Sequence, residues 1–367
     1  MSKQDRRGTD RRRFSLKNFL PAALRDQADQ RQGKRRKGAA ALDVKRLLFS
    51  LLRRSEVKGR VGLTVRADGI GLVHVVRRTG ARPLVKVCRF IPNTGGGDGG
   101  AELFALIQTL KSLELLKGAF VGLLFPGQYQ IFPAEAPQVP REELATAMRW
   151  RIKDRLDFPV ADAVVDVFDL PGSRGGGEMI YVVATQTGHV RGCARLFHDA
   201  GLTLAAIDIL ELALRNLTVL TRDDADGLGL LFMDRRDGLV LVTKGGVLYL
   251  ARPIEQGVEQ LLESLDGRAM VDAQEMVRSP VLDTLSLEVQ RTMDYFESHF
   301  GQPPVSCIHV APTPVPFPGL QGALAEKLGM RIKNLPVTDI LEWEDEVDAM
   351  DLARCLPALG AALREEG

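Results

Sequence analysis

Residues 228 to 254 read LGLLFMDRRDGLVLVTKGGVLYLARPI and contain three short apolar runs. The runs are 228–233, 239–243 and 247–251. Between them lie RRDG at 235–238 and KGG at 244–246, and each segment carries the glycine that tight hairpin turns favour. The stretch therefore predicts an antiparallel meander of three strands.

A second meander of the same kind is predicted earlier in the chain. Its apolar runs, 61–65, 71–76 and 84–90, are separated by ADG at 67–69 and TGA at 79–81. It lies 168 residues upstream of the other meander, measured from Gly62 to Leu230. Helical segments follow both meanders, so the pattern indicates a duplicated α/β architecture.

Length and charge bound the class of protein. The chain has 367 residues and 45% hydrophobic content, so it can bury a large core divided over more than one lobe. Residues 1–60 carry a net charge of +13, whereas residues 61–367 carry −11. No apolar run reaches the ~18 residues that a membrane-spanning helix needs, and the first 20 residues are too charged for a signal peptide. We therefore expect a cytoplasmic body.

The cysteines and histidines show no metal-ligand spacing. The four cysteines, at 88, 193, 307 and 355, form no CxxC pair, and each lies in an apolar context. The five histidines, at 74, 189, 198, 299 and 309, likewise lack ligand spacing. The sequence therefore predicts reduced core cysteines and no metal site.

Residues 1–59 form a basic tail, most of which is predicted to be disordered. Within it, residues 42–54 place an apolar stripe beside Lys45, Arg46, Arg53 and Arg54, the pattern of a basic amphipathic helix. Such a helix can lie on an anionic membrane surface or pack on the protein's own body, and the sequence favours neither. Nucleic acid is disfavoured as a partner, because the arginine clusters lack interleaved aromatic residues and a recognisable binding fold.

A helix over 141–156 and two strands predict a small inserted domain. The apolar stripe of this helix is Leu144, Met148, Ile152 and Leu156. Trp150 falls off that stripe, so it either packs on a second face or anchors a partner. Strands at 163–170 and 179–185 and a helix at 188–200 complete the predicted insertion.

The helix predicted over 283–300 has the strongest periodicity in the chain. Asp283 or Thr284 can cap it. Its buried stripe is Leu285, Val289, Met293, Phe296 and Phe300. A strand at 305–310 and helices at 320–328 and 352–363 are predicted to follow.

Several stretches carry a resemblance to a known family. The longest is EAPQVPREEL at 135–144, which continues into AMRWRIKD at 147–154 and LDFPV at 156–160. The others are LEVQRTMDYF at 287–296, FPGL at 317–320 and ALGAALR at 358–364. Together they resemble the PilM-like, actin-fold pilus assembly proteins, and most closely the MshI proteins of MSHA-type pilus biogenesis. The resemblance covers residues 60–364 and leaves the tail unexplained.

The resemblance implies an α/β, actin-like fold, which is a ribonuclease H-like duplicated fold of two lobes. Each lobe would begin with one of the two meanders, and a small α/β subdomain would be inserted in the first lobe near 137–200. The expected divisions are a tail over 1–59 with its amphipathic helix, a first lobe over 60–220 and a second lobe over 221–367.

The same resemblance locates a nucleotide site that has lost most of its pattern. In ATP-binding relatives the first turn carries Asp-x-Gly and a downstream Lys, the second turn carries another Asp-x-Gly, and the last core strand ends in Gly-Gly. Here those places hold Thr64, Arg66 and Gly71 in the first turn, Asp234 and Arg236 in the second, and Ala311 and Pro312 at the last strand. Asp234 alone keeps the residue type of the pattern.

These residue types are poorly suited to a nucleotide. Side chains on Arg66 and Arg236 would obstruct the close approach of backbone N–H groups to phosphates. Thr64 cannot hold Mg²⁺-bound water as a carboxylate does, and Pro312 has no N–H to offer. The two arginines could instead bind phosphate themselves, or pair with acids of the interlobe cleft such as Asp68, Asp234 or Asp237.

By resemblance, the chain is a non-catalytic scaffold of a pilus assembly platform, peripheral at the cytoplasmic side of the inner membrane and without a cofactor. In the family, the body captures the N-terminal peptide of a bitopic, PilN-like protein between the first lobe and the inserted subdomain, and it meets other platform proteins. On this sequence the groove falls around 139–160 and strand 120–125, with Trp150, Arg151 and Phe158 as contacts. The alternative is an ATP-binding switch or ATPase that uses Mg²⁺ at an altered site, and Asp234 favours it.

Overall fold

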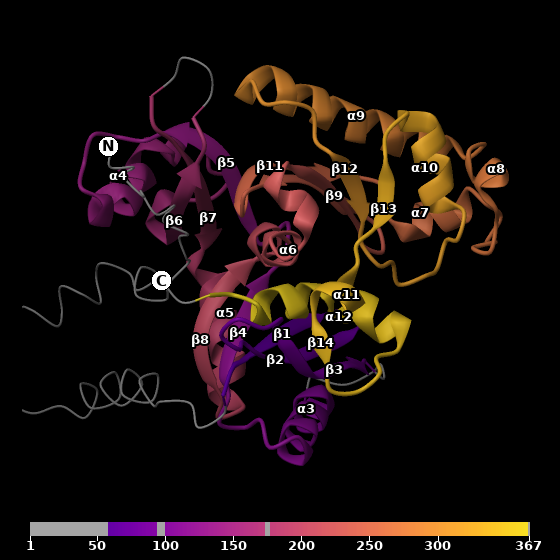
Figure 1. Ribbon diagram of the computed structural model, residues 1–367. Helices are drawn as coiled ribbons and strands as arrows, with labels where there is room; N and C mark the ends of the chain where they lie inside the picture. Colours follow the sequence, from indigo (N-terminus) through magenta and orange to yellow (C-terminus); the bar gives the residue numbers. More distant parts are fainter. Residues whose placement is uncertain (1–57, 94–99, 173–176, 366–367) are drawn as a thin grey trace, which may run out of the picture.

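The first meander forms the middle of a six-stranded sheet (Figure 1). Its antiparallel strands are β1 (Arg60–Arg66), β2 (Gly69–Val76) and β3 (Leu84–Pro92). The parallel strand β4 (Ala119–Leu124) lies beside β1, and β8 (Thr203–Ile209) pairs in parallel with the far side of β4. The near-continuous burial of β1, β2 and β4 indicates that both faces of this sheet are covered.

This computed structural model describes residues 58–93, 100–172 and 177–365. The basic tail predicted over 1–59 and its amphipathic helix therefore lie outside the described residues, apart from residues 58 and 59.

The second meander forms a five-stranded sheet built on the same plan. It comprises β9 (Leu228–Met233), β10 (Gly238–Lys244), β11 (Val247–Ile254), β12 (Cys307–Val310) and β13 (Ile332–Asn334). In each sheet a parallel strand lies beside the first strand of the meander, β4 beside β1 and β12 beside β9. The duplicated architecture predicted from the sequence is confirmed.

Helices cover both sheets. Those nearest the first sheet are α3 (Gly100–Ser112), α5 (Thr187–Asp199), α6 (Leu210–Thr218) and α12 (Ala349–Ala362). The second lobe carries α7 (Val258–Glu263), α8 (Ala273–Met276), α9 (Pro280–Phe300) and α10 (Leu320–Leu328). The short helix α11 (Val337–Ile340) contacts β14 (Glu342–Trp343), a strand of the first sheet. Helix α6 lies between the lobes and contacts β8 and α12 on one side and β10 and β11 on the other (Figure 1).

Helix α9 begins earlier than the sequence pattern predicted. Its N-cap is Ser279, whose Oγ accepts a hydrogen bond from the backbone N–H of Leu282 at 3.3 Å. Pro280 fits the first helical position because the N–H of that position has no partner inside a helix. Asp283 therefore lies in the first turn rather than at the cap, and Gly301 ends the helix at a left-handed φ of 61°.

The inserted subdomain has a sheet and a core of its own. Its strands are β5 (Tyr129–Glu135), β6 (Ala163–Leu170) and β7 (Met179–Gln186), in the order β5-β7-β6. Helix α4 (Leu144–Arg151) packs on β6 and buries Leu144 and Met148 in this small core, which Ile152 completes. Short 3₁₀ turns at Arg141–Glu143 and Lys153–Arg155 flank α4, so the helix predicted over 141–156 is interrupted at both ends.

The bounds of the subdomain differ from the predicted 137–200. Its sheet includes β5 and ends with β7, so the subdomain spans residues 129–186. Helix α5 belongs to the first lobe, because Val190 and Phe197 pack in the main core and the Phe197 ring lies 5.9 Å from that of Phe120 on β4.

The C-terminal segment returns to the first lobe. Strand β14 (Glu342–Trp343) pairs with β3, and α12 crosses the first sheet (Figure 1). A Cβ on Gly62 would lie 1.8 Å from the carbonyl oxygen of Ala358, and one on Gly360 would lie 2.1 Å from that of Ala213. Glycine therefore allows α12 to touch both β1 and α6. The predicted second lobe over 221–367 is too long, because residues 342–364 pack with the first lobe.

Candidate functional site

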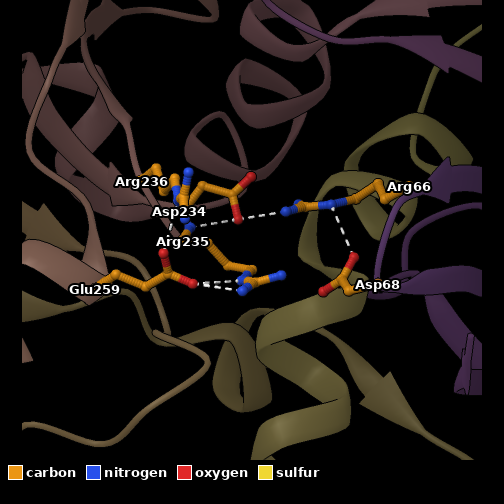
Figure 2. A network of polar contacts seen from close by, with 6 residues as sticks. All are labelled: Arg66, Asp68, Asp234, Arg235, Arg236 and Glu259. Atoms are coloured by element: carbon orange, nitrogen blue, oxygen red, sulfur yellow. Dashed lines mark hydrogen bonds and ion pairs between the residues drawn. The ribbon is translucent and has the colours of Figure 1, made fainter. Parts of the chain in front are cut away.

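The two lobes meet at an ion pair between equivalent positions of the two meanders. Arg66 ends β1 and Asp234 follows β9, and the two residues are 168 positions apart, the offset of the repeat. Arg66 Nη2 donates to Asp234 Oδ1 at 2.5 Å, while Arg66 Nε lies 3.5 Å from Asp68 Oδ1. Figure 2 shows Arg66 and Asp68 entering the cleft from one lobe and Asp234 from the other. This ion pair bridges the two lobes.

Little free space remains around this pair. The Arg66 guanidinium also lies 5.3 Å from the centre of the Phe125 ring, within the range of a cation–π contact. The free volume between the lobes at this point is about 10 Å³, which is room for about one water molecule. Its lining residues are Arg66, Asp68, Phe232, Met233, Asp234, Pro314, Ala353 and Arg354. This space is too small for a phosphate group unless the Arg66 side chain moves.

Two amides of the second turn and two at the start of α7 are engaged within the protein. The amide of Asp234 donates to the carbonyl of Asp237 at 2.8 Å, and the amide of Arg235 donates to Asp234 Oδ1 at 2.8 Å. At the start of α7, Val258 N donates to the carbonyl of Asp234 and Glu259 N to that of Arg235, both at 2.8 Å. These hydrogen bonds hold the turn against the start of α7.

Arg236 points away from the cleft (Figure 2). Its side chain is 81% exposed, and its Nε donates to Glu259 Oε2 at 2.8 Å. Arg235 donates to Glu259 Oε1 with both Nε and Nη2. Hydrogen bonds from Arg236 and Arg235 lower the pKa of Glu259. The prediction that Arg236 pairs with Asp68, Asp234 or Asp237 was wrong, whereas the same prediction for Arg66 is confirmed by its contacts with Asp68 and Asp234.

Thr64 and Gly71 lie beneath α12 and do not line the free volume between the lobes. The two residues are cross-strand partners on β1 and β2, and Thr64 is fully buried. A Cβ at Gly71 would lie 2.6 Å from Thr64 Oγ1 and 3.6 Å from the Ala358 side chain, so the glycine makes room for the threonine under the helix. Thr64 Oγ1 finds no hydrogen-bond partner among the described residues.

The end of the last core strand is closed as well. The backbone N–H of Ala311 donates to the carbonyl of Leu231 at 2.8 Å, and so continues the pairing of β12 with β9. Pro312 follows and has no N–H. The positions taken from the nucleotide-site pattern therefore do not form one site. Arg66 and Asp234 pair in the cleft, whereas Thr64 and Gly71 are buried under α12. Arg236 points outward, and Ala311 extends the pairing of β12 with β9.

The residues predicted to contact a partner lie on the inserted subdomain. Trp150 is 62% exposed on the outer side of α4, and Arg151 beside it is exposed. Phe158 is half-buried against the small core, so packing already uses much of its ring. Trp150 does not belong to the core, which excludes the packing role that the sequence left open.

An apolar groove lies elsewhere, where the first sheet meets α5. It encloses about 280 Å³. Its lining residues are Leu63, Val65, Gly122, Leu123, Leu124, Gln128, Gly188, His189, Gly192, Cys193, Leu196 and Phe197. The predicted strand 120–125 contributes to it, but Trp150, Arg151 and Phe158 do not. One feature could have indicated it from the sequence, the two glycines at 188 and 192 on one helix. The structure adds that the apolar Val65 is 45% exposed.

Comparison with known proteins bears on the fold. No protein-family model matches the sequence, and no curated protein matches it. A solved structure described as the PilM-PilN type IV pilus biogenesis complex matches with a TM-score of 0.63 and 21% identity, over 83% of this chain and 98% of that one. The chain has an actin-like fold.

Two further structures with weaker scores also match. One is the cytoplasmic domain of EpsL, an inner-membrane component of the Vibrio cholerae type II secretion system, with a TM-score of 0.42 and 14% identity over 81% of this chain and 92% of that one. The other is a Bacteroides thetaiotaomicron protein with an actin-like ATPase fold and unknown function, with a TM-score of 0.43 and 10% identity over 81% and 96%. Among the described residues, no helix is long and apolar enough to cross a membrane.

Proposed function

We propose that this chain is a non-catalytic scaffold of a type IV, MSHA-like pilus assembly platform, of the MshI kind, and that it works without a nucleotide. The observation that carries the proposal is the Arg66–Asp234 ion pair, which bridges the lobes where an actin-like protein with an intact pattern would hold phosphates. The free volume of about 10 Å³ beside the pair and the internally bonded amides of Asp234 and Arg235 support it.

The competing function is an ATP-binding switch. Asp234 favours it, because a carboxylate at this turn is the one residue type that the pattern retains. In this chain, however, that carboxylate accepts from both Arg66 Nη2 and the amide of Arg235. A switch would need to break a contact between two side chains that are 17% and 14% exposed before Mg²⁺ or phosphate could reach Asp234.

The partner that we propose is the N-terminal cytoplasmic peptide of a PilN-like inner-membrane protein. The structural match to a PilM-PilN complex supports this choice of partner. We place the peptide in the groove between β4 and α5, since none of the described residues that line it is an acid, a lysine or an arginine. An extended segment with apolar side chains suits such a lining, because it exchanges exposed apolar surface for packing.

Filling this groove should abolish peptide binding. Outside its own helix, no heavy atom lies within 4 Å of the place where a Cβ on Gly192 would be, so the side chain of Gly192→Leu has room to enter the groove. We expect at least a tenfold loss of affinity for a labelled peptide of the partner, measured by fluorescence anisotropy. The melting temperature should not fall, because leucine favours a helix over glycine by up to about 1 kcal/mol.

Two further variants make that result specific. Gly172→Leu is the matched control, since Gly172 also has open space around its Cβ and lies in the loop after β6. Trp150→Ala tests the outer face of α4, where loss of a desolvated anchor would cost about 2 kcal/mol or more. If Trp150→Ala abolishes binding while Gly192→Leu leaves it intact, the peptide uses α4 and the groove assignment is wrong.

We also propose that the protein is peripheral at the cytoplasmic side of the inner membrane, with the basic tail on anionic lipid. The net charge of +13 over residues 1–60 supports this role, since each Lys or Arg near an anionic surface contributes about 1 kcal/mol. Co-sedimentation with phosphatidylglycerol-containing vesicles should decline as salt is raised, because such attraction is screened within about 10 Å at 0.1 M. Equal co-sedimentation of the full chain and of a variant without residues 1–59 would rule out the tail as the membrane contact.

A further inference from the structure

Three residues with different metal-binding side chains meet beside the second sheet. They are Asp223, Cys307 and His309, and one ligand atom from each lies within 4.8 Å of the other two. The cysteine and the histidine are each 1% exposed, whereas the side chain of Asp223 is 22% exposed and opens toward solvent. The cluster is separate from the interlobe cleft and from the groove beside α5, since it shares no residue with either.

Strand geometry brings the donors to one face. Cys307 and His309 are alternate residues of β12, so their side chains point to the same side of the sheet. Asp223 belongs to the 3₁₀ turn Arg222–Ala225, in the connection between α6 and β9. That turn is held in place by Asp224, whose Oδ2 accepts from Gly246 N at 2.6 Å and whose carbonyl accepts from Gly245 N at 2.8 Å. The carboxylate of Asp223 is therefore presented from a fixed backbone.

A side-chain cation already lies at this cluster. Lys333 is the register partner of His309 on β13, and its Nζ donates to Asp223 Oδ2 at 2.7 Å. His309 Nε2 lies 2.8 Å from the same oxygen, while its buried Nδ1 has no hydrogen-bond partner within the described part of the chain. Ser306 Oγ lies 3.7 Å from Cys307 Sγ. The Lys333 side chain is 39% exposed, so it can leave the carboxylate for solvent without crossing the core.

We propose that Asp223, Cys307 and His309 form a Zn²⁺ site, in which the metal displaces the Lys333 ammonium from the carboxylate and takes water as a fourth ligand. Thiolate, imidazole and carboxylate are the three side-chain ligand types that zinc accepts, at about 2.0–2.3 Å. Mg²⁺ and Ca²⁺ need several oxygen ligands, and the cluster offers a single carboxylate. Binding releases the thiol proton of Cys307 to solvent, and the ammonium of Lys333 keeps its charge after it moves.

The metal would join the connection between the lobes to the core of the second lobe. Residues 219–227 lead from α6 to β9, and Asp223 lies within them. Because zinc would bind only the folded arrangement of this connection and β12, it should stabilise the folded state by mass action. The site requires neither the peptide groove nor the Arg66–Asp234 pair, so its test does not depend on the proposed scaffold function.

The probe is Co²⁺, added to the full chain after treatment with a chelator. Thiolate coordination gives a charge-transfer band in the near ultraviolet, which we expect to saturate at one equivalent and to be removed by Zn²⁺. Zn²⁺ should also raise the melting temperature. Lys333→Met should strengthen binding about tenfold, because it removes the cation that competes for Asp223.

Serine substitutions identify the thiol. Cys307→Ser should abolish the band and weaken binding by about 100-fold or more, with a melting curve of the metal-free protein as the check that it folds. Cys193→Ser is the matched control and should leave the band unchanged, since Cys193 lies on α5. The proposal is overturned if neither the wild type nor Lys333→Met shows a Co²⁺–thiolate band. It is also overturned if the band survives in Cys307→Ser.

Discussion

Asp208→Ala should lower the free energy of unfolding by about 3–5 kcal/mol, because it leaves a buried arginine without its counterion. Arg364 Nη1 donates to Asp208 Oδ2 at 2.8 Å, and the two side chains are 7% and 1% exposed. The pair fixes the end of α12 to the end of β8 on the first sheet. Urea denaturation followed by circular dichroism measures the loss.

A solvent-exposed pair provides the matched control for this variant. Arg268 Nη2 lies 2.5 Å from Glu275 Oε1, and the Glu275 and Arg268 side chains are 39% and 59% exposed. Glu275→Ala should therefore lower the free energy of unfolding by only about 0–1 kcal/mol. The double substitution of Asp208 by Leu and Arg364 by Met should restore much of the stability, because it removes both charges at once. Equal losses for Asp208→Ala and Glu275→Ala would show that α12 is not held in the way described.

The stability of the protein should decline between pH 5 and pH 8 by about 2–3 kcal/mol because of one buried carboxyl. Burial raises the pKa of Glu211 to about 7 from its usual 4.5, against the opposing hydrogen bond from Tyr129 Oη at 2.5 Å. A folded-state pKa above the unfolded value means that the folded protein holds the proton more tightly. The stabilisation is fully present below pH 4.5 and is lost as the pH rises through 7.

Glu211→Gln tests this dependence. The amide cannot ionise, so the variant should not lose this stability as the pH rises. The difference in the free energy of unfolding between variant and wild type should therefore shift by about 2–3 kcal/mol in favour of the variant from pH 5 to pH 8. Asp208 also raises the pKa of Glu211 through its charge, and Asp208 itself pairs with Arg364. Parallel pH profiles of unfolding for variant and wild type would assign the slope to other groups.

The two meanders could be predicted from sequence because their signals are local. Short apolar runs and turn glycines fix each hairpin, and the offset of 168 residues follows from comparing them. The packing of α12 on the first lobe could not be predicted, because the hydrophobic pattern of a helix does not show which sheet it packs against. The helix buries residues on all its faces, and the close approach that places it depends on Gly62 and Gly360, which are 298 residues apart in sequence.

The candidate site could be predicted only in part. Arg66 and Asp234 occupy equivalent places in the repeat, so the sequence could predict that they meet between the lobes. Arg236 was wrongly placed because the turn directs its side chain outward to Glu259 on α7, which lies 23 residues further along the chain. The cluster of Asp223, Cys307 and His309 spans 84 residues between its first two members, so no local spacing reveals it.

Titration calorimetry of Mg²⁺-ATP into the full chain tests the central claim most directly. The sample should first bind the partner peptide, which establishes that it is competent. The account then predicts no heat of nucleotide binding at millimolar Mg²⁺, in the wild type and in Asp234→Ala alike. A micromolar dissociation constant in the wild type that is lost in Asp234→Ala would contradict it, because the cleft closed by Arg66 would then be a working nucleotide site.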